Sequence, residues 1–124
     1  MCSSISYSNQ AFRWYPGNNH PINQQKLTQI TNWWTGLNGK SIHQHHVTEI
    51  ELNKKSGEWK AIQQNTVEFT ICNPQLKYKA SQAHVCFTDG NYSRQIEVIC
   101  IDFDPQQKFI VIYPPDGIER YIFC

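Results

Sequence analysis

The sequence predicts a mainly β domain, in which one N-terminal helix precedes seven or eight antiparallel strands arranged as a meander that curls into a barrel. The strongest support comes from the last third, where three apolar runs are separated only by the connectors 104–107 and 114–117. Both connectors contain Pro, which presets the backbone for a turn, and the second ends in Gly, which tolerates positive φ. Strands joined this tightly are antiparallel neighbours, because a parallel crossover needs about a dozen residues or more. The three runs are 95–103, 109–113 and 118–123.

An arm and a helix are expected before the strands. Residues 1–20 are polar with scattered aromatic side chains, which predicts an irregular N-terminal arm, and 21–124 form a single domain. From Pro21 onward apolar residues recur at helical spacing, so we expect a helix from about 23 to 37. Pro21 favours its start and Gly36 its end. The apolar stripe consists of Ile22, Leu27, Ile30, Trp33, Trp34 and Leu37.

Beyond residue 39 the hydrophobic period becomes two, which is typical of strands. The spacing of these strands, about one per ten residues, favours an all-β barrel or sandwich over βαβ units. Asn73-Pro74 is expected to break the chain between the second and third strands. The strands expected before the meander are 42–52, 59–64 with an extension to 71, 76–80 and 83–87.

An α+β roll is the alternative fold. In that arrangement the helix lies in the concave face of a strongly bent sheet, as in cystatin-like or NTF2-like domains. Both arrangements bury Trp33 and Trp34. They differ in whether the first and last strands pair and close the barrel.

Length and charge restrict the function classes. A chain of 124 residues suits one domain with one core. The 11 basic and 10 acidic side chains leave a formal net charge of +1, so no long-range field attracts nucleic acid or an anionic membrane. No run reaches the eighteen or so apolar residues of a membrane span. We expect neither nucleic acid as a partner nor a membrane span.

The cysteines predict free, buried thiols in a reducing cytoplasm. They lie far apart, contain no C-x-x-C pair and follow no apolar leader typical of secretion. His84 and Cys86 share a strand face, yet no glycine cluster of the oxyanion type adjoins them, so no catalytic residue is predicted. The cysteines are Cys2, Cys72, Cys86, Cys100 and Cys124.

The histidine-rich segment offers a weak metal hypothesis. On a strand, His43 and His45 share one face at about 7 Å, and Glu49 on the same face is a third possible ligand for zinc. The spacing lacks the H-x-x-x-H helix motif and paired cysteines. A histidine ladder facing solvent is therefore the preferred interpretation, and no metal is expected.

Two arginines within the meander carry the ligand hypothesis. Arg94 and Arg120 lie in or beside strands, and an inward guanidinium binds a carboxylate with a fork geometry that lysine cannot match. The simpler interpretation is a structural ion pair with a nearby acidic residue. Asp102 interrupts an apolar run and is a candidate inward polar group, because a buried carboxylate is costly unless it is paired.

Aromatic side chains line either a pocket or a core, and core is the default. Tyr and Trp carry a polar tip that prefers a hydrogen-bond partner, which suits a ligand pocket. The expected ligand-binding residues are Arg94, Arg120, Trp59, Tyr78, Tyr121 and Asp102.

A family resemblance adds to this interpretation. The helix and meander with segments 89–98, 102–104 and 119–123 resemble small cyanobacterial calycin-like proteins, which include the lipocalin-like phycobiliprotein lyases and related uncharacterised domains. The resemblance implies a cytoplasmic calycin-like barrel that holds a linear tetrapyrrole (a bilin) or another flat hydrophobic acid. It also implies a chaperone-like role in presenting the bilin to a client protein. Arg120 or Arg94 would then contact the ligand carboxylate.

Two functions are therefore expected from the sequence. The first is a small-ligand-binding protein, more a binding protein than an enzyme and lyase-like if it is one, with a bilin or hydrophobic acid as ligand. The second is a protein-interaction or assembly module with a filled core, which docks a partner through a strand edge and the aromatic residues Phe12, Trp14 and Tyr15.

Overall fold

One helix and eight strands make up the protein in the computed structural model, which describes residues 6–53 and 55–124, and their side chains apart from those of 49–53 and 58–62. All strand pairs are antiparallel, so the predicted mainly β class is confirmed. The elements are β1 (Phe12–Trp14), α1 (Pro21–Thr35), β2 (Ser41–Asn53), β3 (Glu58–Lys79), β4 (Gln82–Asp89), β5 (Tyr92–Val98), β6 (Cys100–Asp104), β7 (Phe109–Tyr113) and β8 (Glu119–Phe123).

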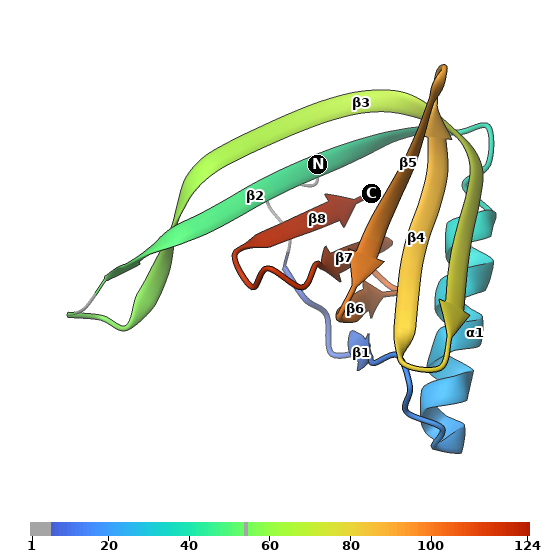
Figure 1. Ribbon diagram of the computed structural model, residues 1–124, viewed down its shortest axis with the longest axis horizontal. Helices are drawn as coiled ribbons and strands as arrows, with labels where there is room; N and C mark the ends of the chain where they lie inside the picture. Colours follow the sequence, from blue (N-terminus) through green and yellow to red (C-terminus); the bar gives the residue numbers. More distant parts are fainter. Residues whose placement is uncertain (1–5, 54) are drawn as a thin grey trace.

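The strands form one bent sheet in the order β1-β6-β7-β8-β2-β3-β4-β5. The predicted meander of seven or eight strands is confirmed in two parts, β6-β7-β8 and β2-β3-β4-β5, which join where β8 pairs with β2. Within the described chain the outer strands β1 and β5 do not pair, so the sheet is not closed into a barrel, and the arrangement is consistent with the α+β alternative. Figure 1 shows β2 and β3 arching over β6, β7 and β8, with β4, β5 and α1 at one side.

A bulge in β3 bends the sheet. Asn73 has a positive φ of 52°, and the register with β4 shifts between Cys72 and Gln75. Pro74 contributes no N–H to the ladder, which suits a bulge and disfavours regular pairing. The indole Nε1 of Trp34 on α1 donates a hydrogen bond of 3.1 Å to the backbone carbonyl of Gln75. The break expected at Asn73-Pro74 is therefore a bend within one long strand.

Three further boundaries differ from the expectation. The helix begins at Pro21, and the side chain of His20 caps it by accepting a hydrogen bond from the backbone N–H of Ile22. The run 95–103 divides into β5 and β6 at Ile99, which leaves the ladder of β5 and donates its N–H to Tyr113 of β7. The stretch expected as an irregular arm contributes β1, which pairs with β6.

The main core lies between α1 and the concave face of the sheet. Trp34 contacts Phe87 of β4 and Phe123 of β8 with ring centroids 5.8 and 5.2 Å apart, and all three side chains are buried. A smaller cluster lies on the opposite, outer face of the sheet. The described chain contains no helix with the length and apolar character needed to cross a membrane. The core residues on the helix are Leu27, Ile30 and Trp34.

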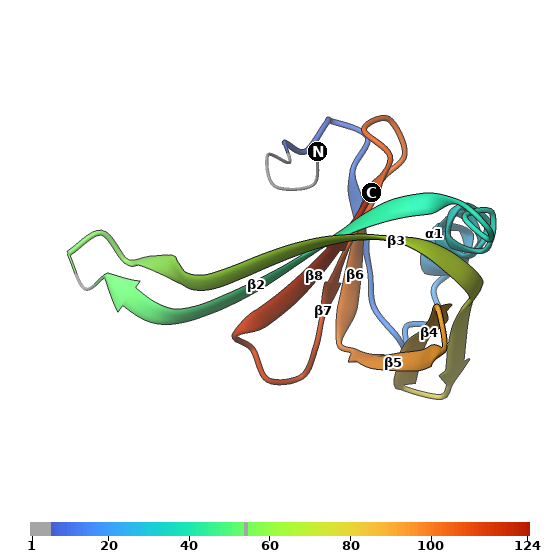
Figure 2. The ribbon, with the colours of Figure 1, turned by 90° about the horizontal axis from the view of Figure 1, so that it is seen from above.

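The N-terminal segment before β1 lies on the outer face. Figure 2 shows residues 6–11 of this segment on the side of the sheet away from β4 and β5. Its Ser8 donates hydrogen bonds to both carboxylate oxygens of Asp104, at 2.6 Å from the backbone N and 2.7 Å from Oγ. Of the aromatic residues expected to dock a partner, Trp14 is buried against the core and Phe12 packs on Phe103. Only Tyr15 of the three is exposed.

Candidate functional site

Alternate side chains of β2 and its neighbours point into the hollow under the arch. Gln44 and Phe123 are register partners, and the next row on the same face contains His46 and Tyr121. Because residues directly opposite on antiparallel strands share a face, β3 adds Val67 and Asn65 to these two rows. The concave face therefore carries apolar and polar side chains side by side.

Arg94 on β5 faces the same hollow. Its side chain lies on the face of β5 that also carries the buried Ile96. Its Nη1 donates a hydrogen bond of 3.1 Å to Oε1 of the buried Gln44, and its Cζ lies 5.3 Å from the ring centroid of Phe87. Phe87 in turn stacks on Phe69 at 5.7 Å. The guanidinium is thus held above the ring of Phe87 at the edge of the core.

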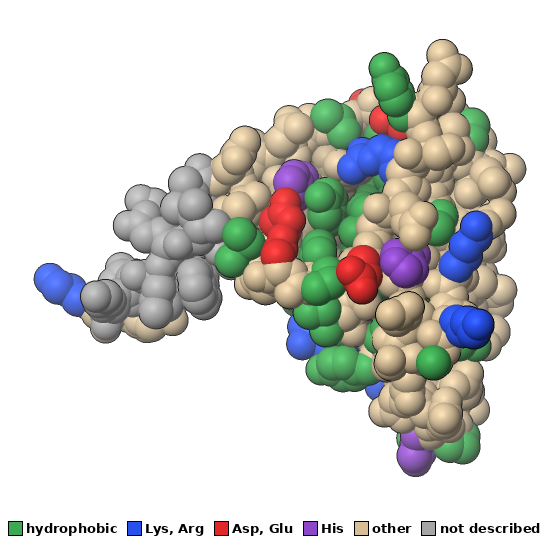
Figure 3. Space-filling view, in the orientation of Figure 1, with side chains coloured by type: hydrophobic (Ala, Val, Ile, Leu, Met, Phe, Trp, Pro, Cys, Tyr) green, Lys and Arg blue, Asp and Glu red, His purple; other side chains and the backbone are tan. Residues whose placement is uncertain are grey.

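The space-filling view shows the hollow directly. In Figure 3, green hydrophobic side chains are exposed below the arch, with blue basic atoms at its upper right and purple and red atoms at its left. Val67 is 37% exposed, and Phe69 and Tyr121 are partly exposed. This part of the concave face is open, whereas the part beside α1 is filled by core side chains.

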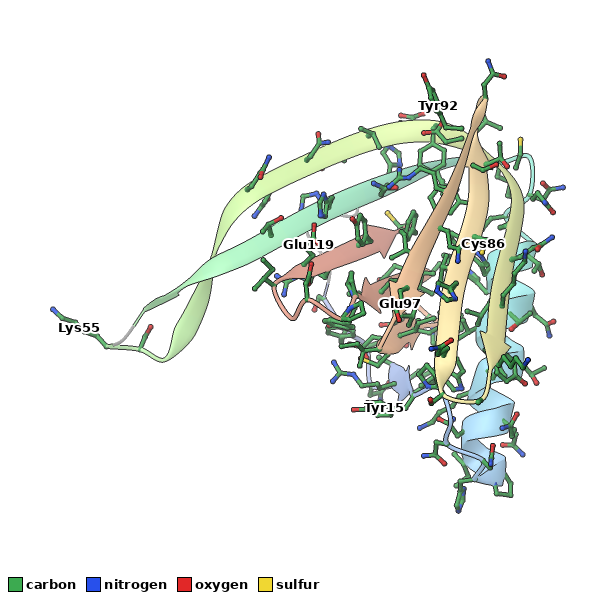
Figure 4. The ribbon with its side chains drawn as sticks, viewed as in Figure 1. Tyr15, Lys55, Cys86, Tyr92, Glu97 and Glu119 are labelled. Atoms are coloured by element: carbon green, nitrogen blue, oxygen red, sulfur yellow. The ribbon has the colours of Figure 1, made fainter. Side chains whose placement is uncertain are left out.

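An aromatic stack with an acidic partner forms the left wall. The rings of His46 and Tyr121 are parallel, with centroids 4.3 Å apart and 4° between their planes. Nε2 of His46 lies 2.8 Å from Oε1 of Glu119, which Figure 4 labels on β8 beside the turn that precedes it. Burial raises the pKa of Tyr121, and the charge of Glu119 adds to this, while Arg94 opposes it. Tyr121 is therefore a neutral hydrogen-bonding group.

Two carboxyl groups, Asp116 and Glu119, interact at the edge of this wall. A hydrogen bond with Asp116 raises the pKa of Glu119 above its usual value. Burial would raise the pKa of Asp116 too, but hydrogen bonds from Glu119 and from the backbone N–H groups of Ile118 and Glu119 outweigh burial and lower it. Asp116 thus keeps its charge while Glu119 holds the proton more tightly.

The predicted ligand residues fall on both faces of the sheet. Arg94 and Tyr121 face the hollow, as a shared site requires. Tyr78 is half-exposed and lies against Trp14, with ring centroids 6.2 Å apart. Arg120 alternates with Tyr121 along β8 and points to the outer face. The side chain of Trp59 lies outside the described residues.

Asp102 is a structural residue on the outer face. Asp102 is 7% exposed as a residue, and its carboxylate accepts hydrogen bonds from Arg13, at 2.6 Å from Nε and 2.9 Å from Nη2. The hydroxyls of Tyr7 and Tyr113 each donate to its Oδ2 at 3.0 Å. The partner of Asp102 is thus Arg13, which sequence reasoning missed, because the two are 89 positions apart.

Gln44 and His46 are the site residues that the sequence interpretation missed. They lie two and four positions after the buried Ile42, so the strand period of two places them on the same face as a core residue. The strand period was therefore the signal that could have identified Gln44 and His46. The metal hypothesis instead considered His43 and His45, which lie on the other face.

The histidines of the metal hypothesis have side-chain partners. His43 and His45 share the outer face, where His43 pairs with Glu68 at 3.2 Å and Nδ1 of His45 contacts Oγ1 of Thr66. Among the described residues, no three His, Cys, Asp or Glu side chains gather into a metal-binding group. The side chain of Glu49 lies outside the described part.

The cysteines correct two parts of the expectation, and Cys2 lies outside the described residues. Cys72, Cys86 and Cys100 have free thiols, as predicted, but Cys72 is exposed and Cys86 is partly buried, so the predicted burial is confirmed only for Cys100. Cys124 is disulfide-bonded, so the prediction of five free thiols is wrong at this position.

Comparison with known proteins gives no identification. No protein-family model, curated protein or solved structure matches the chain.

Proposed function

We propose that this protein binds a flat hydrophobic carboxylic acid in the hollow under the β2–β3 arch. Arg94 is the anchor for the carboxylate. The proposal rests on the position of its guanidinium. This group donates a hydrogen bond to Gln44 and lies over the ring of Phe87, beside exposed apolar surface. Binding without chemical conversion is the activity proposed.

The charge of Arg94 selects an anion. A guanidinium has five N–H donors, and the contact with Gln44 uses Nη1, so donors remain for both oxygens of a carboxylate. The partly apolar surroundings strengthen such a pair relative to one in water. Tyr121 and the imidazole of His46 add polar contacts at the opposite wall.

The apolar side chains select a flat body for the ligand. Phe69, Tyr121 and Val67 offer aromatic and branched surface that is already partly exposed, so a planar ligand removes it from water at little ordering cost. Side chains fill the region beside α1. The ligand is therefore proposed to lie in the open half of the concave face, without being enclosed.

The family resemblance narrows the proposed ligand class to a linear tetrapyrrole. A bilin is flat, hydrophobic and carries carboxylates, which matches the chemistry of the hollow. Under this extension the protein is a bilin chaperone of cyanobacterial type, and an open sheet suits a protein that hands its ligand on.

A thermal-shift panel tests the proposal. Biliverdin, a long-chain fatty acid and its methyl ester are added to the wild type, to Arg94→Gln and to Arg120→Gln as the matched control on the outer face. A native-state ligand at a hundred times its Kd stabilises by about 2.7 kcal/mol. We expect stabilisation by an acid in the wild type and the control, and its loss in Arg94→Gln. Stabilisation by neither acid would refute the proposal.

A further inference from the structure

A second recess lies on the outer face of the sheet, away from Arg94. Its volume is about 290 Å3, close to the lower limit of small-molecule pockets, roughly 300 Å3. Strands β7, β8, β2 and β3 and the N-terminal segment all contribute to it. The lining residues that the argument uses are Tyr7, His45, Val47, Val111, Arg120 and Ile122.

The strand register places these side chains in two adjacent rows. Arg120 of β8 is opposite Val47 of β2, and Ile122 is opposite both His45 of β2 and Val111 of β7. Val47, Val111 and Ile122 are at most 3% exposed and pack as one cluster. They form a floor of branched aliphatic groups, and the polar side chains stand around it.

The walls of the recess are fixed by bonds that do not involve a ligand. At one end, the hydroxyls of Tyr7 and Tyr113 bind Asp102, which Arg13 also holds. At the other end, His45 is buried and its Nδ1 contacts Thr66. A recess held open by such contacts is preorganised, which lowers the cost of binding.

Arg120 is the guanidinium in the lining of the recess. Burial lowers the pKa of His45, and the charge of Arg120 lowers it further, so the imidazole next to the guanidinium is neutral. The carboxylate of Asp102 is already paired with Arg13. Arg120 also makes other contacts within the protein. Its five N–H donors allow it to keep such a contact and bind a ligand as well.

We infer that this outer recess is a second binding site, for a compact carboxylate whose small aryl or branched body lies on the aliphatic floor and whose charge pairs with Arg120. A guanidinium beside an apolar floor selects an acid with a short apolar body over a neutral or cationic ligand. The recess is on the opposite face from the hollow of Arg94, so the two sites are independent and take acids of different size.

Benzoate is the probe, with benzyl alcohol as its neutral counterpart. The 15N-labelled wild type is titrated up to roughly 20 mM, a range suited to a fragment of this size. We expect saturable amide shifts for benzoate that cluster on 111–113, 120–122 and 45–47. Saturable binding confined to β4 and β5, or the absence of saturable binding, would overturn the inference.

Matched arginine variants separate the two sites. Measured from the amide shifts of residues 111–113 and 120–122 alone, Arg120→Gln should weaken benzoate binding roughly tenfold to a hundredfold, the effect of losing a charge-assisted hydrogen bond, while Arg94→Gln leaves the affinity at these amides unchanged. Equal affinity in Arg120→Gln and wild type, or equal affinity for benzyl alcohol and benzoate, would contradict the assignment. Should Arg120→Gln fail to fold, the shift map and the alcohol comparison in the wild type decide alone.

Discussion

Arg94 on β5 donates a hydrogen bond of 3.1 Å to Gln44 on β2, although β3 and β4 separate these strands in the sheet order. The contact crosses the hollow and exists because β3 bends the sheet at Asn73. The anchor of the proposed ligand site thus depends on a bulge whose sequence signal is the pair Asn73-Pro74. Changes at the bulge are expected to affect both stability and ligand binding.

Replacing Asn73 tests this dependence. Asn73→Val places a β-branched residue at a φ of 52°, which should lower the free energy of unfolding by about 1–2 kcal/mol. Asn73→Gly is the matched control, because glycine adopts this backbone conformation without strain. Urea unfolding measures both, and equal destabilisation by Val and Gly would show that backbone strain is not the cause.

Trp34 joins the helix to the same bend. Trp34→Phe removes the donor to the carbonyl of Gln75 and part of a buried ring, so we expect a loss of at least about 1 kcal/mol in the free energy of unfolding. Trp33→Phe, at a side chain that packs on Phe103 at 5.5 Å, serves as the comparison. A larger loss for Trp33→Phe than for Trp34→Phe in chemical denaturation would contradict the role assigned to the indole.

The individual strands could be predicted from the sequence, but whether the sheet closes into a barrel could not. The short turns at 104–107 and 114–117 determine the pairing of β6, β7 and β8, because a strand that follows a tight turn can pair only with the strand that precedes the turn. Whether β1 and β5 meet depends instead on how far the bulge at Asn73 rotates the sheet. A break in a strand pattern does not distinguish a bulge from a loop.

The candidate site was predictable only in part. Arg94 and Tyr121 were found because charged and aromatic groups within apolar strands are conspicuous. Arg120 was assigned to the same ligand, yet it directly precedes Tyr121 on β8, and consecutive strand residues point to opposite faces of the sheet. The pairing of Asp102 with Arg13 spans most of the chain, and no local pattern indicates it.

The Arg13–Asp102 pair should anchor β1 and the N-terminal segment to the outer face. A double-mutant cycle with Arg13→Gln and Asp102→Asn is expected to give a coupling free energy of about 1 kcal/mol, since the side chain of Arg13 is 44% exposed and solvent screens the pair. Urea unfolding of the four proteins provides the measurement. Strict additivity would mean that the two hydrogen bonds contribute nothing to stability.

Asp104 should make the protein acid-sensitive. Burial would raise its pKa, but hydrogen bonds from Ser8, Gln106 and Gln107 outweigh burial and lower it. A lowered folded-state pKa means that the stabilisation is present above the unfolded-state pKa, about 3.9, and is lost as pH falls through the folded value.

Asp104→Asn tests whether the carboxylate of Asp104 is the source of this loss of stability in acid. The variant should be less stable than the wild type at neutral pH, and the difference should shrink in acid. Thermal melting between neutral pH and about pH 2 follows both proteins. A difference that stays constant across this range would rule out the carboxylate as its source.

Affinity for an acid relative to its primary amide tests the central claim most directly. The two ligands share a shape and differ in charge, so their Kd ratio isolates the carboxylate contact. With a flat hydrophobic acid in calorimetric titration, we predict that wild-type protein prefers the acid by roughly tenfold or more, and that Arg94→Gln abolishes the preference. An equal preference in both proteins would contradict the assignment of Arg94 as the anchor.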